Sequence, residues 1–576
     1  MLTNLRITSI LLLLAVVTGC ATENKVMEQA EIEQEFQQPE EIIEPQPYEL
    51  EDVKNPEKFV KYYLRSKIGI YNSNSLESIA QNHYRLALEN PSNIKIQEEA
   101  FLLLLANKSY AKAITVSKNK DVADYLTFEQ LFNFSQLLAQ NETEQAHEVL
   151  KEILSEQQRL PYLKILNKYF DYYQHKNIER LSEEILAIKS SVALDGFKYY
   201  YIARAYEAAE NYQEAFKLYE KAFLENSLRT ETVFKRLVYT AKLVDAEELK
   251  KNLFRSNSKY GKDLYLVDQA FIDINELKPL NNDVKNVTSQ IFYDLGWSIN
   301  QAVSTNLAGL NFLALSDYIV PNAQAKFQIA KGYASNEWNP DAIELLKSID
   351  KKSQYYWSAQ IILIDIIKQD NPAKAIKLAK QLQATKRFNS HYIEGIIGQI
   401  YLNDDQFKKA IQSFTIAIQN DASPKLFFSR AVAYEKTNQI DLALDDLKTA
   451  YNLNPKNPIV LNYLGYLLID LHKNPEQGLE YIEQAVRLDP TNPASLDSLG
   501  WAYLNLKEYD KGLALLEKAY ALAPQDGVIA GHLADAYYKA DRKKEAIIYW
   551  KKALELEKSD KREIKRIEKQ LYKYNN

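Results

Sequence analysis

The feature that most constrains the fold of this 576-residue chain is an internal repeat. In the stretch LDSLGWAYLNLKEYDKGLALLEKAYALAP, residues 496–524, small and large apolar residues stand at fixed positions. The same markers return 35 residues upstream and 34 residues downstream, as Gly465, Leu468, Gly478, Ile482, Ala485 and Pro490, then Gly500, Tyr503, Gly512, Leu516, Ala519 and Pro524, then Ala534, Tyr537, Ala546, Trp550 and Ala553. Two more copies precede these, beginning at Gly398 and Ala431. Such a period is typical of stacked units, each of which contacts its neighbours.

Within each unit the apolar residues are spaced three and four apart, which predicts two helices that each bury one stripe. Small residues among the markers allow the two helices of a pair to approach closely. A proline after the second helix and connectors such as Asn403-Asp404-Asp405 end the helices. The chain also has only 15 Gly and 17 Pro, few for a loop-rich β or α/β enzyme of this length. We therefore predict an all-α chain of antiparallel helix pairs, each pair contacting only its neighbours.

The N-terminal segment has the features of an export signal. MLTNLRITSILLLLAVVTGC combines Arg6, a short apolar run and small residues before Cys20, the only cysteine of the chain. The run is too short to span a bilayer as a mature helix. Val17-Thr18-Gly19-Cys20 resembles a bacterial lipobox, which implies that residues 1–19 are removed and that Cys20 becomes the lipidated first residue of the mature chain; the alternative is an ordinary signal peptide with a chance cysteine. Because Ala21 and not Asp follows, the analogy favours the outer membrane, with the chain on its periplasmic face.

The marker density divides the remaining chain. Residues 20–56 are rich in Glu, Gln and Pro and cannot bury enough apolar surface to order themselves, so we expect a lipidated tether there. Residues 57–290 are predicted to be divergent helical repeats. Their markers are clear at 197–226, weaker at 76–190 and poorest at 227–290, where the assignment rests on apolar periodicity alone. Residues 291–557 are predicted to be clearer repeats, with the densest markers at 392–557. Residues 558–576, basic but interleaved with Glu, are expected to form a solvated capping helix.

The sequence offers little catalytic chemistry. Its six histidines show no HExxH or paired-ligand spacing, and a single cysteine excludes a thiolate metal cluster or a CxxC pair. GxSxG, GxxxxGK[ST] and GxGxxG are absent. The net charge of −6 argues against a nucleic-acid partner. We therefore predict a non-enzyme without cofactor or metal, although a Ser/His/Asp triad is defined by geometry, and a site in the irregular segment 227–290 stays open.

The marker pattern resembles the tetratricopeptide repeat, with its 34-residue period and Leu-Gly-x₂-Tyr…Ala-x₃-Phe…Pro motif. The resemblance implies a superhelical solenoid in which the first helix of each pair lines a concave groove. Mapped onto this sequence, the predicted groove residues are Asn462, Tyr466, Asp497, Ser498, Trp501, His532, Asp535 and Tyr538, with Tyr463 beside them. Aromatic faces alternating with hydrogen-bonding groups suit an extended peptide or a partner helix.

An alternative reading is that the aromatic residues Tyr463, Tyr466 and Trp501 pack between repeats. The Asn, Asp and Ser positions are the better candidates for partner contact. Eukaryotic chaperone-binding repeats clamp a terminal carboxylate with Lys, Arg and Asn. Here Asp497, Ser498, His532 and Asp535 stand at the matching positions, so that mode is disfavoured.

The lipobox, the acidic tether and the run from VLNYLGYLLID to IIYWKKALEL together resemble the large outer-membrane tetratricopeptide lipoproteins of Gram-negative bacteria, among them the adaptor of a carboxyl-terminal processing protease. The resemblance implies a scaffold that binds a periplasmic protease and its cell-wall hydrolase substrates. A pilotin-like lipoprotein for pilus, secretin or envelope assembly is the alternative.

Overall fold

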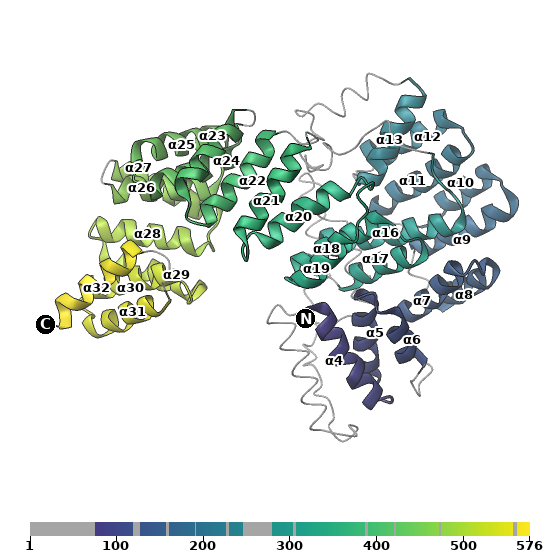
Figure 1. The fold of residues 1–576 in the computed structure, drawn as a ribbon, viewed down its shortest axis with the longest axis horizontal. Helices are drawn as coiled ribbons and strands as arrows, with labels where there is room; N and C mark the ends of the chain where they lie inside the picture. The colour runs from purple at the N-terminus through teal and green to yellow at the C-terminus, as the bar shows by residue number, and fades with distance from the viewer. Residues whose placement is uncertain are drawn as a thin grey trace. The chain divides into compact units, whose positions relative to one another are not determined.

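The computed structural model describes residues 75–118, 127–156, 161–189, 192–225, 230–245, 279–302, 307–385, 390–419, 422–471, 474–556 and 561–575. The predicted signal peptide, Cys20 and the tether lie outside the described residues, as does the stretch 246–278. Regular structure in the described residues is entirely helical (Figure 1). The chain divides into two compact units, residues 1–366 and 367–576. The predicted domain border at 290/291 falls inside α16 (Val284–Ala302), within the first unit.

The first unit keeps the repeat period although its sequence markers are weak. Its helices are α4 (Leu76–Glu89), α5 (Ile94–Ala106), α6 (Tyr110–Lys118), α7 (Thr127–Ala139), α8 (Thr143–Glu156), α9 (Pro161–His175), α10 (Ile178–Leu186), α11 (Val192–Ala208), α12 (Tyr212–Glu220) with the π turn η2 (Lys221–Glu225), α13 (Glu231–Leu243), α16, α17 (Leu307–Ile319), α18 (Ala323–Ser335), α19 (Asn339–Lys347) and α20 (Tyr356–Ile367). Turn residues with φ between 54° and 65° recur at Lys108, Asn141, Lys176, Glu210 and Asp245. These residues are 33, 35, 34 and 35 positions apart, so the helix pairs expected from apolar periodicity alone are present.

Contacts in the first unit reach far beyond neighbouring pairs. The amides of Leu76 and Glu77, at the start of α4, donate to the Asp341 carboxylate of α19 at 2.8 and 3.1 Å. Lys108 forms an ion pair with Asp317, and helix α17 packs against both α5 and α7. Figure 1 shows α16 and α17 alongside the helices of the earlier pairs. The expectation that each pair contacts only its neighbours is therefore wrong for this unit, because later helices bury apolar surface that the early pairs leave uncovered.

Buried polar groups fasten these remote elements together. The Tyr201 hydroxyl of α11 donates to Asp294 of α16 at 2.6 Å, and Gln290 donates to the other carboxylate oxygen at 2.9 Å. Burial raises the pKa of Asp294 to about 6, although the two hydrogen bonds and nearby Arg204 oppose the rise. A buried carboxyl with hydrogen-bond donors on both oxygens fixes the register of α16 against α11.

A second buried cluster joins α11 to α12 and α13. The Glu207 carboxylate accepts from Arg236 Nε at 3.1 Å and also from its Nη2, while the Tyr219 hydroxyl donates to it at 2.8 Å. Glu207 and Arg236 are 3% and 6% exposed, so this pair is shielded from water.

The second unit is a regular series of antiparallel pairs. It comprises α21 (Pro372–Ala384), α22 (Ser390–Asn403), α23 (Phe407–Ile418), α24 (Pro424–Lys436), α25 (Ile440–Leu453), α26 (Pro458–Asp470), α27 (Pro475–Leu488), α28 (Pro493–Asn505), α29 (Tyr509–Leu522), α30 (Gly527–Lys539), α31 (Lys543–Leu556) and α32 (Lys561–Asn575). Pro455, Pro490 and Pro524 each follow a second helix by two residues, as the sequence predicted. Helix α32 occupies the segment predicted to cap the series. None of the described helices has the length and apolar character needed to cross a bilayer.

Glycines hold the two helices of a pair close together. A Cβ atom on Gly465 of α26 would lie 2.5 Å from the carbonyl oxygen of Gly478 in α27 and 2.7 Å from Ile482 Cγ1. The Gly500–Gly512 pair of α28 and α29 is nearly as tight, with a Cβ on Gly500 lying 3.0 Å from the Gly512 oxygen. The prediction that small marker residues permit close helix approach is confirmed at these pairs.

Candidate partner-binding surface

The eight predicted groove residues lie on three first helices of the second unit: α26, α28 and α30. We call the surface that these positions form on α26, α28 and α30 the first-helix face. It has two sections, one on α26 and one formed by α28 and α30, which we call the α28–α30 section. Asn462, Tyr466, Trp501 and Tyr538 are half-buried, whereas Asp497, Ser498, His532 and Asp535 are 4–8% exposed. Of the polar residues favoured for partner contact, the Asp and Ser residues are thus the more deeply covered ones, and Asn462 is half-buried.

Three of the predicted residues meet between α28 and α30. The Nδ1 atom of His532 lies 2.9 and 3.0 Å from the two Asp497 carboxylate oxygens. The Trp501 ring stacks on the His532 ring with centroids 4.3 Å apart and planes 22° apart. The Trp501 Nε1–H is buried and has no hydrogen-bond partner among the described residues. The helix positions that the repeat register predicted to share one face do so.

Asp535 contacts residues of two other helices, α31 and α32, neither of which the sequence predicted to be part of the site. The Trp550 Nε1 atom of α31 donates to Asp535 at 2.8 Å, and Arg566 of α32 forms an ion pair with the same carboxylate. Burial raises the pKa of Asp535, while Arg566 and His532 act against that rise. The Arg566 guanidinium also lies 5.8 Å from the centre of the Trp501 ring.

Arg566 and Trp550 were missed for identifiable reasons. Trp550 occupies a repeat marker position, which predicts packing within its own helix pair. Arg566 lies in a charged stretch, which predicts a solvated helix. The apolar residues Ile567 and Leu571 on the same helix were the available signal, since their spacing of four marks a buried stripe. Ile567 is fully buried, and Leu571 packs beside it against the α30–α31 core.

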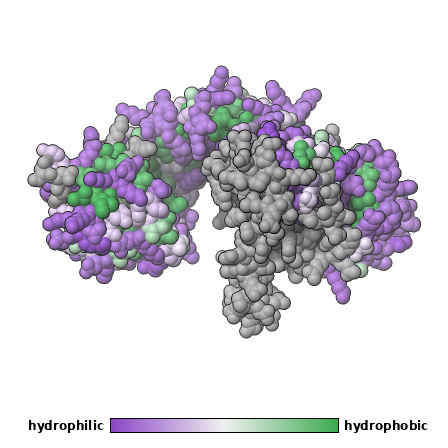
Figure 2. Space-filling model, turned by 90° about the horizontal axis from the view of Figure 1, so that it is seen from below, coloured by the Kyte–Doolittle hydropathy of each residue, from purple (hydrophilic) through white to green (hydrophobic). Residues whose placement is uncertain are grey.

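The section on α26 is more open. Ile459, at the start of this helix, is 59% exposed, and Asn462 and Tyr466 are half-buried on the next turns. Tyr463 packs edge-on against Phe428 of the preceding first helix, with centroids 5.4 Å apart. This aromatic therefore serves stacking between repeats, as the alternative reading held. Figure 2 shows hydrophobic residues, in green, interspersed with hydrophilic ones on the second unit, at the left of the view.

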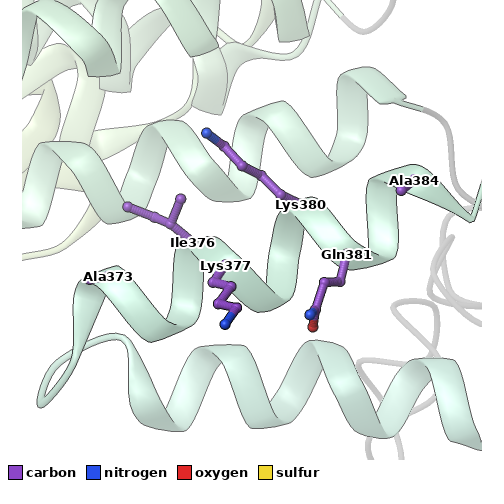
Figure 3. A pocket seen from close by; sticks show the side chains of 6 residues that line it. All are labelled: Ala373, Ile376, Lys377, Lys380, Gln381 and Ala384. Atoms are coloured by element: carbon purple, nitrogen blue, oxygen red, sulfur yellow. The ribbon is translucent and has the colours of Figure 1, made fainter.

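The geometry offers little for chemistry on a small molecule. Among the described residues, no group of three or more His, Cys, Asp or Glu side chains could hold a metal ion. One open hollow of about 490 Å³ lies along α21 (Figure 3). It is lined by Ala373, Ile376, Lys377, Lys380, Gln381 and Ala384, a set without an acid–base pair or an activated nucleophile.

We compared the chain with protein families and with solved structures. Residues 346–559 match the tetratricopeptide repeat family. Among solved structures, a thermophilic tetratricopeptide protein of Thermus thermophilus is 23% identical over 32% of this chain and 99% of its own, with a TM-score of 0.29. MamA from Desulfovibrio magneticus RS-1 is 20% identical over 30% of this chain and 98% of its own, with a TM-score of 0.26. The pilF protein of Pseudomonas aeruginosa is 20% identical over 32% of this chain and 86% of its own, with a TM-score of 0.27.

No curated protein matches the chain. The solved structures are each similar to about a third of it. The repeat family match and the observed succession of antiparallel helix pairs together assign the chain to the all-α fold class of tetratricopeptide-repeat solenoids.

Proposed function

We propose that this chain is a non-catalytic, lipid-anchored scaffold that binds proteins in the periplasm. Tetratricopeptide repeats usually mediate protein–protein interaction, and the family match covers most of the second unit. In its finer form the proposal is that the scaffold couples a carboxyl-terminal processing protease to cell-wall hydrolase substrates. That form rests on the sequence resemblance of the repeat run, the lipobox and the tether.

The observation that carries the proposal is the open section of the first-helix face on α26. It combines an exposed aliphatic side chain, Ile459, with the half-buried side chains of Asn462, whose Oδ1 atom is itself buried, and Tyr466. Tyrosine and exposed apolar groups anchor protein interfaces, and nearby amides give orientation through hydrogen bonds. Such a surface suits a polypeptide better than a reacting small molecule.

An adaptor of this kind accelerates proteolysis without supplying a catalytic group. Holding protease and substrate on one scaffold raises their mutual effective concentration to roughly the millimolar range. The first-helix face would supply one binding site, and the tether would keep the scaffold near the cell wall.

We expect a photo-cross-linker placed at Ile459 to capture protein partners in the native envelope. The matched control is Ile548, which is similarly exposed at 62% but lies on the second helix α31 and outside the first-helix face. Mass spectrometry of the adducts should recover a periplasmic protease and cell-wall hydrolases from position 459 and far less from position 548. Recovery of a secretin or pilus subunit would support the pilotin alternative instead. Equal yields at both positions would contradict the proposed surface.

The anchor is tested separately. We expect Cys20→Ser to abolish metabolic labelling of the chain with a radioactive fatty acid, because the thiol that would carry the lipid is lost. Fluorography of the immunoprecipitated chain measures this. A Thr18→Ser variant, which keeps the cysteine, serves as the control and should be labelled as wild type is. Labelling of Cys20→Ser equal to that of wild type would contradict lipid anchoring.

A further inference from the structure

The C-terminal helix α32 packs against α31 and α30 and reaches part of the first-helix face. Its Arg566 reaches Asp535 of α30 and lies over the Trp501 ring of α28. Its Ile567 is fully buried in a cluster with Leu533 and Trp550, and Leu571 packs against the same cluster. Two aliphatic side chains thus hold this helix against α30 and α31, and one guanidinium reaches from it to the α28–α30 section of the first-helix face.

The surface beneath α32 complements it in charge. Asp497 and Asp535 lie on that section, whereas residues 561–575 carry six Lys or Arg and two Glu, a net charge of +4. His532 faces both acids: it hydrogen-bonds to Asp497 and interacts electrostatically with Asp535. Opposite charge favours a basic helix here over an acidic or neutral one.

The seating of α32 is incomplete. Of its residues 564–573, Ile567 is buried and Tyr572 is 74% exposed, whereas ten residues of α30 are buried. The covered Trp501 Nε1–H remains without an acceptor among the described residues. A buried donor that is left unpaired loses its hydrogen bond to water and gains none in return. A helix that supplied an acceptor to this donor as well as a guanidinium to Asp535 would fit better than α32 does.

We propose that α32 is a displaceable occupant of the α28–α30 section, and that the protein partner which replaces it presents a basic amphipathic helix. The partner helix carries an arginine for Asp535, an aliphatic residue directly after it for the Ile567 seat, and a second aliphatic residue four positions further on. This inference rests on the proposed function, since it names the kind of protein segment that the scaffold binds. While α32 is seated, only the α26 section is open to partners.

The test uses the full chain and a labelled synthetic peptide of residues 558–576. In wild type the tethered α32 competes with the peptide at an effective concentration in the millimolar range. Arg566→Glu places a carboxylate against Asp535 and should unseat α32. We expect fluorescence anisotropy to show the peptide binding this variant at least tenfold more tightly than wild type. A peptide that itself carries Arg566→Glu should not bind.

Lys569→Glu is the matched control variant, because it makes the same charge change at an exposed position of α32. It should leave peptide binding as in wild type. Hydrogen exchange should show faster exchange of α32 amides in Arg566→Glu, with those of α28 unchanged. If the peptide fails to bind the unseated variant, if α32 stays protected, or if α28–α31 unfold with it, α32 is an integral cap and the inference is wrong. Partner capture at Ile459 is independent of all these results, so the proposed function and this inference can fail separately.

Discussion

Replacing Glu207 with alanine is expected to destabilise the first unit by about 3–5 kcal/mol, because Arg236 would lose its buried carboxylate. Arg236 is 6% exposed and cannot regain hydration without opening α11 against α13. The Tyr219 hydroxyl would lose its acceptor at the same time. Native-state hydrogen exchange should show amides of α11–α13 opening roughly 10²- to 4 × 10³-fold more often, at about 1.4 kcal/mol per decade.

The control is Glu148→Ala. Glu148 pairs with Lys151 at 2.8 Å, but the two side chains are 70% and 50% exposed, so the pair is solvated in the folded chain. Its loss should leave the free energy of unfolding essentially unchanged. A Glu207→Ala effect as small as that of Glu148→Ala would show that the buried cluster does not fasten these helices.

Gly465→Ala is expected to destabilise the second unit by about 2–3 kcal/mol. The new methyl group would lie 2.5 Å from the Gly478 carbonyl oxygen, a backbone atom that moves only if α26 and α27 separate. Separation would also loosen the contacts of Ile482. Urea unfolding monitored by circular dichroism, with hydrogen exchange of α26 and α27 to locate the change, measures the effect.

Gly395→Ala on α22 is the matched change at a roomier position. There the nearest atom to an added Cβ is Leu426 Cδ2 at 3.2 Å, the end of a flexible side chain. The better helix propensity of alanine should leave stability unchanged or raise it by up to about 1 kcal/mol. Similar losses from the two variants would contradict the close approach at Gly465.

The regular part of the fold was predictable because the residues that repeat in the sequence are those that pack within each helix pair. At Gly465, Gly478 and Ile482, each marker makes the contact that its size suggests. The early pairs were harder to predict because their sequence carries fewer of these marker residues. Their tight turns do not differ from those of the regular pairs, since Lys108 and Lys176 have positive φ just as Lys507 does.

The remote packing of the first unit could not be predicted from periodicity. A repeat pattern encodes contacts between neighbours, whereas Lys108–Asp317 and Tyr201–Asp294 join residues 209 and 93 positions apart. Charged and polar residues of this kind read in the sequence as solvated surface. Their pairing follows from helices that fold back, which no local pattern records.

The sequence predicted where the candidate surface lies but not how much of it is buried or which residues cover it. The repeat register placed Asp497, Trp501 and His532 on one face, and the structure brings them into contact. That Asp535 is covered by Arg566 could not be read from the sequence, because the partner lies on a helix whose composition suggests solvent. Contact of these residues with an external protein stays a prediction.

The tie between Asp341 and the start of α4 has a consequence for how the first unit forms. A solenoid whose units meet only their neighbours can fold progressively as the chain emerges. Here the first amide of α4 bonds to a carboxylate 265 residues further along the chain. Such distant contacts give the first unit a high contact order, so we expect it to complete its folding late and cooperatively. Until then its early helices expose apolar surface, and a chain threaded through a membrane N-terminus first would depend on holdase chaperones during that interval.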